Sequence, residues 1–197
     1  MKKKRILCSL LTLAMLMALL TVTAFAEEAA LPLPAEGGPL ASGIYQLSGN
    51  LTISNPLKIL KNSNITIDLN GHTLDTTAAS WGVLVSGTCT IVDSAGNGTI
   101  ESGEHAFGIT FGGELHINGG TINASDTAIV NAAGAELTIS NAKVFSSSSS
   151  ALQNLGTVTI QGAKLNSGVA AGIFNLDGSV TVSDSTIYGN DNGILNG

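Results

Sequence analysis

Apolar residues recur along this chain at intervals of 21 to 23 residues, in three separate columns. Each column marks a run of three to five residues in which apolar and polar positions alternate, as in a β-strand with one buried face. The columns are Ile117, Ile139, Ile160 and Val182; Ile100, Ile122, Val144, Leu165 and Ile187; and Ile129, Leu152, Ile173 and Ile194. They keep one register over at least four repeats, which predicts three strands per repeat.

One such repeat cannot bury its apolar face alone. Stacked repeats can, if each strand pairs in parallel with its counterpart in the next coil. A helical repeat is excluded, because the chain is rich in Gly, Thr, Ser and Asn and no apolar stripe recurs every 3.6 residues. The sequence therefore predicts an all-β, single-domain parallel β-helix over residues 43–197. About seven coils of roughly 4.8 Å each would give a rod on the order of 35 Å long.

The repeat is irregular in two places. Ahead of Ile65, apolar residues follow one another too closely, which predicts an irregular first coil or a cap. Between Ile91 and Ile117 the spacing grows to 26 residues, which predicts a longer loop at residues 93–97 or 101–106.

The C-terminal end carries an apolar edge. Residues 192–196 match the first strand of a new coil, and no capping segment follows before Gly197. Such an edge is a template for further strands. We therefore expect the β-helix to be incomplete here, with further coils or a stacking partner at this edge.

The N-terminus has the three parts of a secretory signal peptide. Residues 2–5 are basic, residues 6–22 are apolar, and Ala24–Ala26 form a small-residue cleavage site. This predicts a signal peptide at residues 1–26; a retained membrane anchor is the alternative, because the apolar run reaches the short limit for spanning a bilayer. Residues 27–42 contain every proline except Pro56 and predict a flexible spacer.

Charge changes the picture of possible partners. Without residues 1–26, four lysines remain against 14 acidic residues, a net charge of −10, and there is no arginine. This balance argues against nucleic acid and anionic lipid. Cys8 would leave with the signal peptide, so Cys89 has no intramolecular disulfide partner. Its place as the first inward residue of a strand predicts a buried thiol.

Three motifs carry a resemblance to a known family. Residues 65–74 (ITIDLNGHTL) resemble its opening coil, and Gly98–Ile100 and Gly120–Ile122 resemble its strand starts. The chain resembles the right-handed parallel β-helices of the pectate-lyase-like superfamily, and more closely the adhesin-like repeats of bacterial exported proteins. Because this fold hosts enzymes, adhesins and spacers alike, the resemblance specifies architecture more strongly than function.

The resemblance also implies an internal asparagine ladder. Each candidate follows an inward aliphatic residue by two positions, where a buried amide needs partners above and below it. The candidates are Asn131, Asn154, Asn175 and Asn196. A polar binding row is the alternative interpretation of the same residues.

No catalytic or metal-binding set is found. The family's lyases use an arginine base beside a calcium cluster, and its polygalacturonases use paired aspartates, neither of which this sequence contains. A lyase with Lys143 or Lys164 as the base remains an alternative. His72, His105 (expected in a loop) and His116 are scattered, which predicts no metal site, and no cofactor is expected.

Candidate binding residues lie at outward positions. Lys143 and Lys164 belong to one outward column, about 4.8 Å apart. An acidic glycan would relieve their repulsion; alternatively, both side chains simply extend into water. A second outward column is more apolar and has Trp81 nearby. Its members are Leu84, Thr110, Val130, Gln153, Phe174 and Leu195. The serines at 146–150 are expected in a solvated turn.

These observations predict an exported, non-catalytic β-helix module for surface adhesion or for binding a glycan or another partner. The candidate binding residues are Trp81, Val130, Gln153, Phe174, Lys143 and Lys164. We expect the protein to be secreted or at the cell surface, not embedded in the membrane, with a glycan or a host or cell-surface partner. The alternatives are a polysaccharide lyase or glycoside hydrolase acting on acidic polysaccharide, and a structural stalk.

Overall fold

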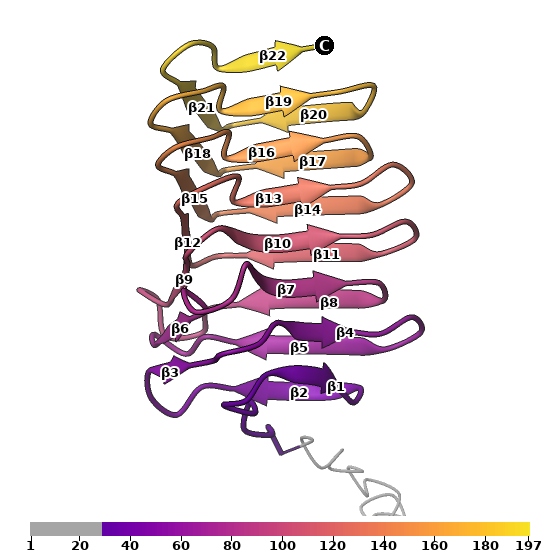
Figure 1. Ribbon diagram of the computed structural model, residues 1–197, viewed down its shortest axis with the longest axis vertical. Coiled ribbons are helices and arrows are strands. Elements are labelled where there is room, and N and C mark those ends of the chain that lie inside the picture. Colours follow the sequence, from indigo (N-terminus) through magenta and orange to yellow (C-terminus); the bar gives the residue numbers. More distant parts are fainter. Residues whose placement is uncertain (1–28) are drawn as a thin grey trace, which may run out of the picture.

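The computed structural model describes residues 29–197, which form an all-β parallel solenoid of about seven turns that contains no helix. The predicted signal peptide lies outside the described residues. Three parallel sheets run along the solenoid axis, and the chain visits them in the same order in every coil (Figure 1). The fold predicted from the apolar columns is therefore confirmed.

The strands of each sheet follow the order of the coils. Sheet 1 contains β1 (Gly38–Leu40), β4 (Leu57–Ile59), β7 (Trp81–Val85), β10 (His105–Ile109), β13 (Ile129–Asn131), β16 (Leu152–Asn154), β19 (Ile173–Asn175) and β22 (Ile194–Asn196). Sheet 2 contains β2 (Gly43–Gln46), β5 (Asn64–Asp68), β8 (Thr88–Val92), β11 (Glu114–Asn118), β14 (Glu136–Ser140), β17 (Thr157–Gln161) and β20 (Ser179–Ser183). Sheet 3 contains β3 (Leu51–Thr52), β6 (Thr73–Asp75), β9 (Thr99–Ser102), β12 (Thr121–Ala124), β15 (Lys143–Ser146), β18 (Lys164–Ser167) and β21 (Thr186–Gly189).

Inward side chains stack from coil to coil to form one continuous core. In sheet 2, Ile65 pairs with Cys89, which pairs with Leu115, and all three are fully buried. The predicted burial of Cys89 is confirmed, and burial raises the pKa of its thiol to about 12. A thiol held in its neutral form behaves as a small apolar side chain rather than as a nucleophile.

The first coil pairs in parallel with the second in all three sheets, but it is short in sheet 1, where Gly38 pairs with Leu57 only 19 residues later, so the expected irregularity is confined to that sheet. Gly43 in β2 pairs with Ile65 in β5, and Leu51 in β3 pairs with Leu74 in β6. The apolar residues ahead of Ile65 look crowded in the sequence because they come from two successive strands of different sheets, β3 and β4.

Part of the segment expected to be a spacer belongs to the solenoid. Gly38–Leu40 form β1, which pairs with β4, and Leu31 forms an isolated bridge with Tyr45. Leu33 and Leu40 are buried. The prolines conceal this in the sequence, yet β1 is the end strand of its sheet, where a missing backbone N–H is tolerated.

The extra residues of the longest coil lie at the corner between β8 and β9, so the loop predicted at residues 93–97 is confirmed. The alternative at residues 101–106 is wrong, because these residues end β9 and begin β10. His105 is therefore the first residue of β10 rather than a loop residue. At the start of the 93–97 loop, the carboxylate of Asp93 accepts hydrogen bonds from two backbone N–H groups, at 2.8 and 2.6 Å.

Asp68 joins this corner to the coil before it. Its carboxylate accepts hydrogen bonds from the backbone N–H and the hydroxyl of Ser94, at 3.0 and 2.7 Å. It also accepts from the side chain of Gln46 at 2.8 Å and from the backbone of Asn70 at 2.9 Å. Burial alone raises the pKa of Asp68, but the four hydrogen bonds outweigh it and hold the pKa below its usual value.

The serines at 146–150 are only partly solvated, in contrast to the expected turn. Ser146 is fully buried, and its hydroxyl donates to the carbonyl of Asp126 at 2.7 Å. In the next coil, the buried Ser167 donates to the carbonyl of Ser149 at 2.6 Å. These inward hydroxyls supply the corner carbonyls with donors that an aliphatic side chain lacks.

Asparagine amides form a ladder along the end of sheet 1. The Nδ2 of Asn131 donates to Oδ1 of Asn154 at 2.8 Å, and Asn154 donates to Asn175 at 2.8 Å. Asn175 continues the ladder to Asn196 at 3.0 Å. The ladder begins at Asn131 because its partner in the preceding coil is Ile109, which offers no amide.

Within residues 29–197, no helix has the length and hydropathy needed to cross a bilayer.

Candidate functional site

The residues predicted to bind a partner lie on two different faces of the solenoid. Val130, Gln153 and Phe174 project from sheet 1, whereas Lys143 and Lys164 project from sheet 3. The sequence therefore identified positions on two surfaces rather than one site.

On sheet 1, the predicted apolar column is only partly continuous. Val130, Gln153 and Phe174 are successive partners and half-buried. The position before Val130 is occupied by Gly108, not by Thr110 as the spacing suggested. The apolar stripe is thus interrupted at Gly108.

Trp81 lies in the same strand as Leu84 but far from the later members of this column. It lies in β7, four coils from Phe174 in β19, or roughly 19 Å along the axis. Its ring stacks on His105 with centroids 4.3 Å apart and packs so close to Gly108 that a Cβ there would lie 2.7 Å from it. The Trp81 ring therefore occupies the space on the outer face of sheet 1 that a side chain at Gly108 would fill. It does not form a site with Phe174.

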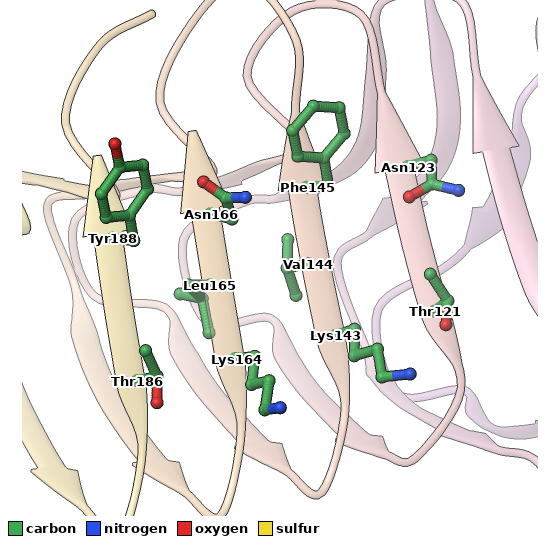
Figure 2. A pocket seen from close by; sticks show the side chains of 10 residues that line it. All are labelled: Thr121, Asn123, Lys143, Val144, Phe145, Lys164, Leu165, Asn166, Thr186 and Tyr188. Carbon is green, nitrogen blue, oxygen red and sulfur yellow. The ribbon is translucent and has the colours of Figure 1, made fainter. Parts of the chain in front are cut away.

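On sheet 3, two outward rows run parallel to the solenoid axis. The lysine row consists of Thr121, Lys143, Lys164 and Thr186. The aromatic row consists of Asn123, Phe145, Asn166 and Tyr188. Figure 2 shows the two rows side by side on β12, β15, β18 and β21.

The aromatic row was missed in the sequence. Each of its members lies two residues after a member of the lysine row, so the same alternation that placed Lys143 outward also placed Phe145 outward. Phe145 is 37% exposed and Tyr188 is 56% exposed. Asn166 lies between them in the row, so two ring faces flank an amide at intervals of one coil.

The two rows line a shallow hollow of about 340 Å³ on the outer face of sheet 3. Both lysine side chains are exposed and extend away from the sheet (Figure 2). No carboxylate lines the hollow. One coil before the aromatic row, in β9, Glu101 is the partner of Asn123 and accepts a hydrogen bond from its side chain at 2.8 Å. The hollow therefore offers two cations, two amides and two aromatic rings to a ligand.

No group of three or more His, Cys, Asp or Glu side chains in the described part of the chain has the arrangement of a metal site. His72 and His116 lie on other faces or corners, and His105 is engaged by Trp81 and by the carbonyl of Thr127 at 2.8 Å. The hollow on sheet 3 brings the predicted residues Lys143 and Lys164 together with the aromatic residues Phe145 and Tyr188.

No family model, curated protein or solved structure matches this chain.

Proposed function

We propose that this protein is an exported, non-catalytic β-solenoid that binds a glycan through the outer face of sheet 3. The observation that carries the proposal is the aromatic row beside the lysine row. Sugar rings present apolar C–H faces that stack on aromatic rings, and hydroxyl groups that an amide such as Asn166 binds. Both features lie on one exposed face, where amides and aromatic rings alternate from coil to coil.

The lysine pair favours an acidic glycan over a neutral one. Lys143 and Lys164 are direct partners in β15 and β18, so their like charges lie about one coil apart. Carboxylate or sulfate groups along an extended sugar chain would neutralise both. The predicted signal peptide and the resemblance to adhesin-like bacterial repeats support a location outside the cell.

A polysaccharide lyase or hydrolase is the second candidate. It would need a base and a charge-stabilising partner at the hollow, and the lining residues offer lysines without a carboxylate. A structural stalk is the third candidate, but the exposed aromatic rings favour a binding face over a stalk.

Binding is tested with polygalacturonate, chondroitin sulfate and a neutral cello-oligosaccharide on the protein without residues 1–26. We expect the double variant Phe145→Ala/Tyr188→Ala to bind the acidic glycans at least tenfold more weakly, because both stacking surfaces are removed. Phe174→Ala, on sheet 1, is the matched control and should bind as the unchanged protein does.

Two results would contradict the proposal. Equal binding by the double variant and the control would move the site away from sheet 3. Release of unsaturated or reducing ends from polygalacturonate would replace the binding module with an enzyme.

A further inference from the structure

Sheet 2 carries an acidic counterpart of the lysine pair. Glu114 in β11 and Glu136 in β14 are direct partners, so two like charges again lie one coil apart on an outer face. Glu136 is exposed; Glu114 is half-buried and accepts a hydrogen bond from Thr88 at 3.2 Å. Like charges directly opposite one another in a sheet are destabilising. The chain therefore carries two repulsive pairs of opposite sign on two different faces.

The two pairs have the same spacing. Glu114 and Glu136 are separated by one strand-to-strand step in sheet 2, and Lys143 and Lys164 by one such step in sheet 3. If sheet 2 of one copy faced sheet 3 of another, each lysine would meet one glutamate. Because Glu136 and Lys143 belong to the same coil, this match requires a stagger of one coil between the copies.

Apolar groups select the relative direction of the copies. When two solenoids lie with their axes parallel, the strands of the facing sheets run in opposite directions. Phe145, which is two positions after Lys143, then lies opposite the position two before Glu114. That position is in the corner between β10 and β11, which also holds Phe111. Phe111 is 82% exposed.

The same alignment applies two coils further along the axis. Thr186 falls opposite Thr157, and Tyr188 falls opposite Leu155, which is 36% exposed. With antiparallel axes, the charge pairs would still match, but Phe145 would lie opposite Thr138, over the polar side of sheet 2. Charge and apolar contacts therefore agree only for parallel axes.

We propose that copies of this protein pack side by side with parallel axes, sheet 2 of one copy against sheet 3 of the next, joined by Glu114–Lys143 and Glu136–Lys164. This contact uses a different surface on each partner. It is therefore heterologous, and because each copy is shifted by one coil along the axis, repetition of the contact gives an open array rather than a closed ring. The proposal goes beyond glycan binding and does not depend on it, but because both use the outer face of sheet 3, a bound glycan and a neighbouring copy would exclude one another there.

The contact is small. Five coils by one strand length give a face of about 24 Å by 14 Å, a few hundred Å² on each copy, which is below the ~800 Å² per partner of a standard interface and fits only a weak, transient contact. Each copy also carries a net charge of −10 without residues 1–26. We therefore expect association at high concentration or on a crowded surface, and dissociation as salt screens the ion pairs.

The test is a charge exchange without any glycan. Sedimentation velocity is measured at increasing concentration for the unchanged protein and for the variants Lys143→Glu/Lys164→Glu and Glu114→Lys/Glu136→Lys. The unchanged protein should associate, and each variant alone should associate at least tenfold more weakly, because like charges then face one another. An equimolar mixture of the two variants should associate again, since opposite charges are restored at the contact.

Controls separate this contact from others. The variant Lys58→Glu/Lys61→Glu changes the net charge by the same amount as Lys143→Glu/Lys164→Glu, but its substitutions lie outside the proposed contact. It should associate as the unchanged protein does. Glu114→Lys/Glu136→Lys leaves sheet 3 intact, so its glycan binding should persist even if assembly fails. An unchanged protein that stays monomeric throughout, variants that associate normally, or a mixture that stays monomeric would each overturn the proposal.

Discussion

Asp68 is a buried carboxylate that acts in folding rather than in binding. Its four hydrogen bonds come from two neighbouring coils and from its own corner, so it ties three segments together. The lowered pKa reports that these donors stabilise the ionised form more than burial disfavours it. Because the folded pKa lies below the ordinary value, this stabilisation is present at neutral pH and is lost as the pH falls through the folded pKa.

Replacement of Asp68 by Asn should therefore destabilise the protein in a pH-dependent way. Both carboxylate oxygens of Asp68 accept hydrogen bonds, whereas the NH₂ group of Asn is itself a donor and would face two of these donors. We expect the free energy of unfolding to fall by about 1–3 kcal/mol at pH 7. The loss should shrink as the pH falls from the ordinary Asp pKa of about 3.9 toward the lower pKa of folded Asp68, because the unfolded chain takes up the proton first and the advantage of the ionised folded form declines. Urea unfolding at pH 7 and pH 3 measures this.

Asp191→Asn is the control, because Asp191 is exposed. It should change stability little at either pH. A destabilisation of Asp68→Asn that is the same at pH 7 and pH 3 would show that charge is not the cause.

At the level of strands and corners, the sequence predicted the strands that repeat from coil to coil but not the segments where the repeat is irregular. The apolar columns predicted the strands and their register from Ile65 onward because a stacked fold repeats its inward positions. The strand β1 was missed because its prolines suggested a spacer, and Thr110 was assigned to a column that Gly108 occupies. An irregular corner cannot be aligned by spacing alone.

The candidate site was half predicted for a similar reason. Lys143 and Lys164 were found because charge is rare in this chain. Phe145 and Tyr188 were not predicted as binding residues, because aromatic side chains in strands are often buried in the core. Only the pairing of β15, β18 and β21 brings them into one row beside the lysines.

The asparagine ladder links elements from coil to coil, so damage in its middle should cost more than damage at its exposed end. Asn154→Ala removes the partner of both Asn131 and Asn175 and leaves the backbone N–H of Gly156 unpaired. We expect a loss of about 2–4 kcal/mol, measured by urea unfolding. Asn196→Ala is the matched control, since Asn196 is exposed and accepts one ladder bond from Asn175.

The control should lose no more than about 1 kcal/mol. If Asn196→Ala were as costly as Asn154→Ala, the ladder would not derive its stability from burial of paired amides.

The three sheets of the solenoid differ in the side chains that they present to solvent. Sheet 3 displays lysines and aromatic rings, sheet 2 displays threonines with the Glu114–Glu136 pair, and sheet 1 carries an interrupted apolar stripe. Because all three faces repeat at the coil height, each can meet a partner that repeats along the axis, such as a sugar chain or another solenoid.

The central claim is that the outer face of sheet 3 is the binding surface. The most direct measurement is a titration of isotope-labelled protein without residues 1–26 with a polygalacturonate oligosaccharide, followed by backbone amide chemical shifts. The account predicts that the largest changes fall in β12, β15, β18 and β21. Changes centred on sheet 1 or sheet 2, or no changes at oligosaccharide concentrations that saturate binding to other glycan-binding modules, would contradict it.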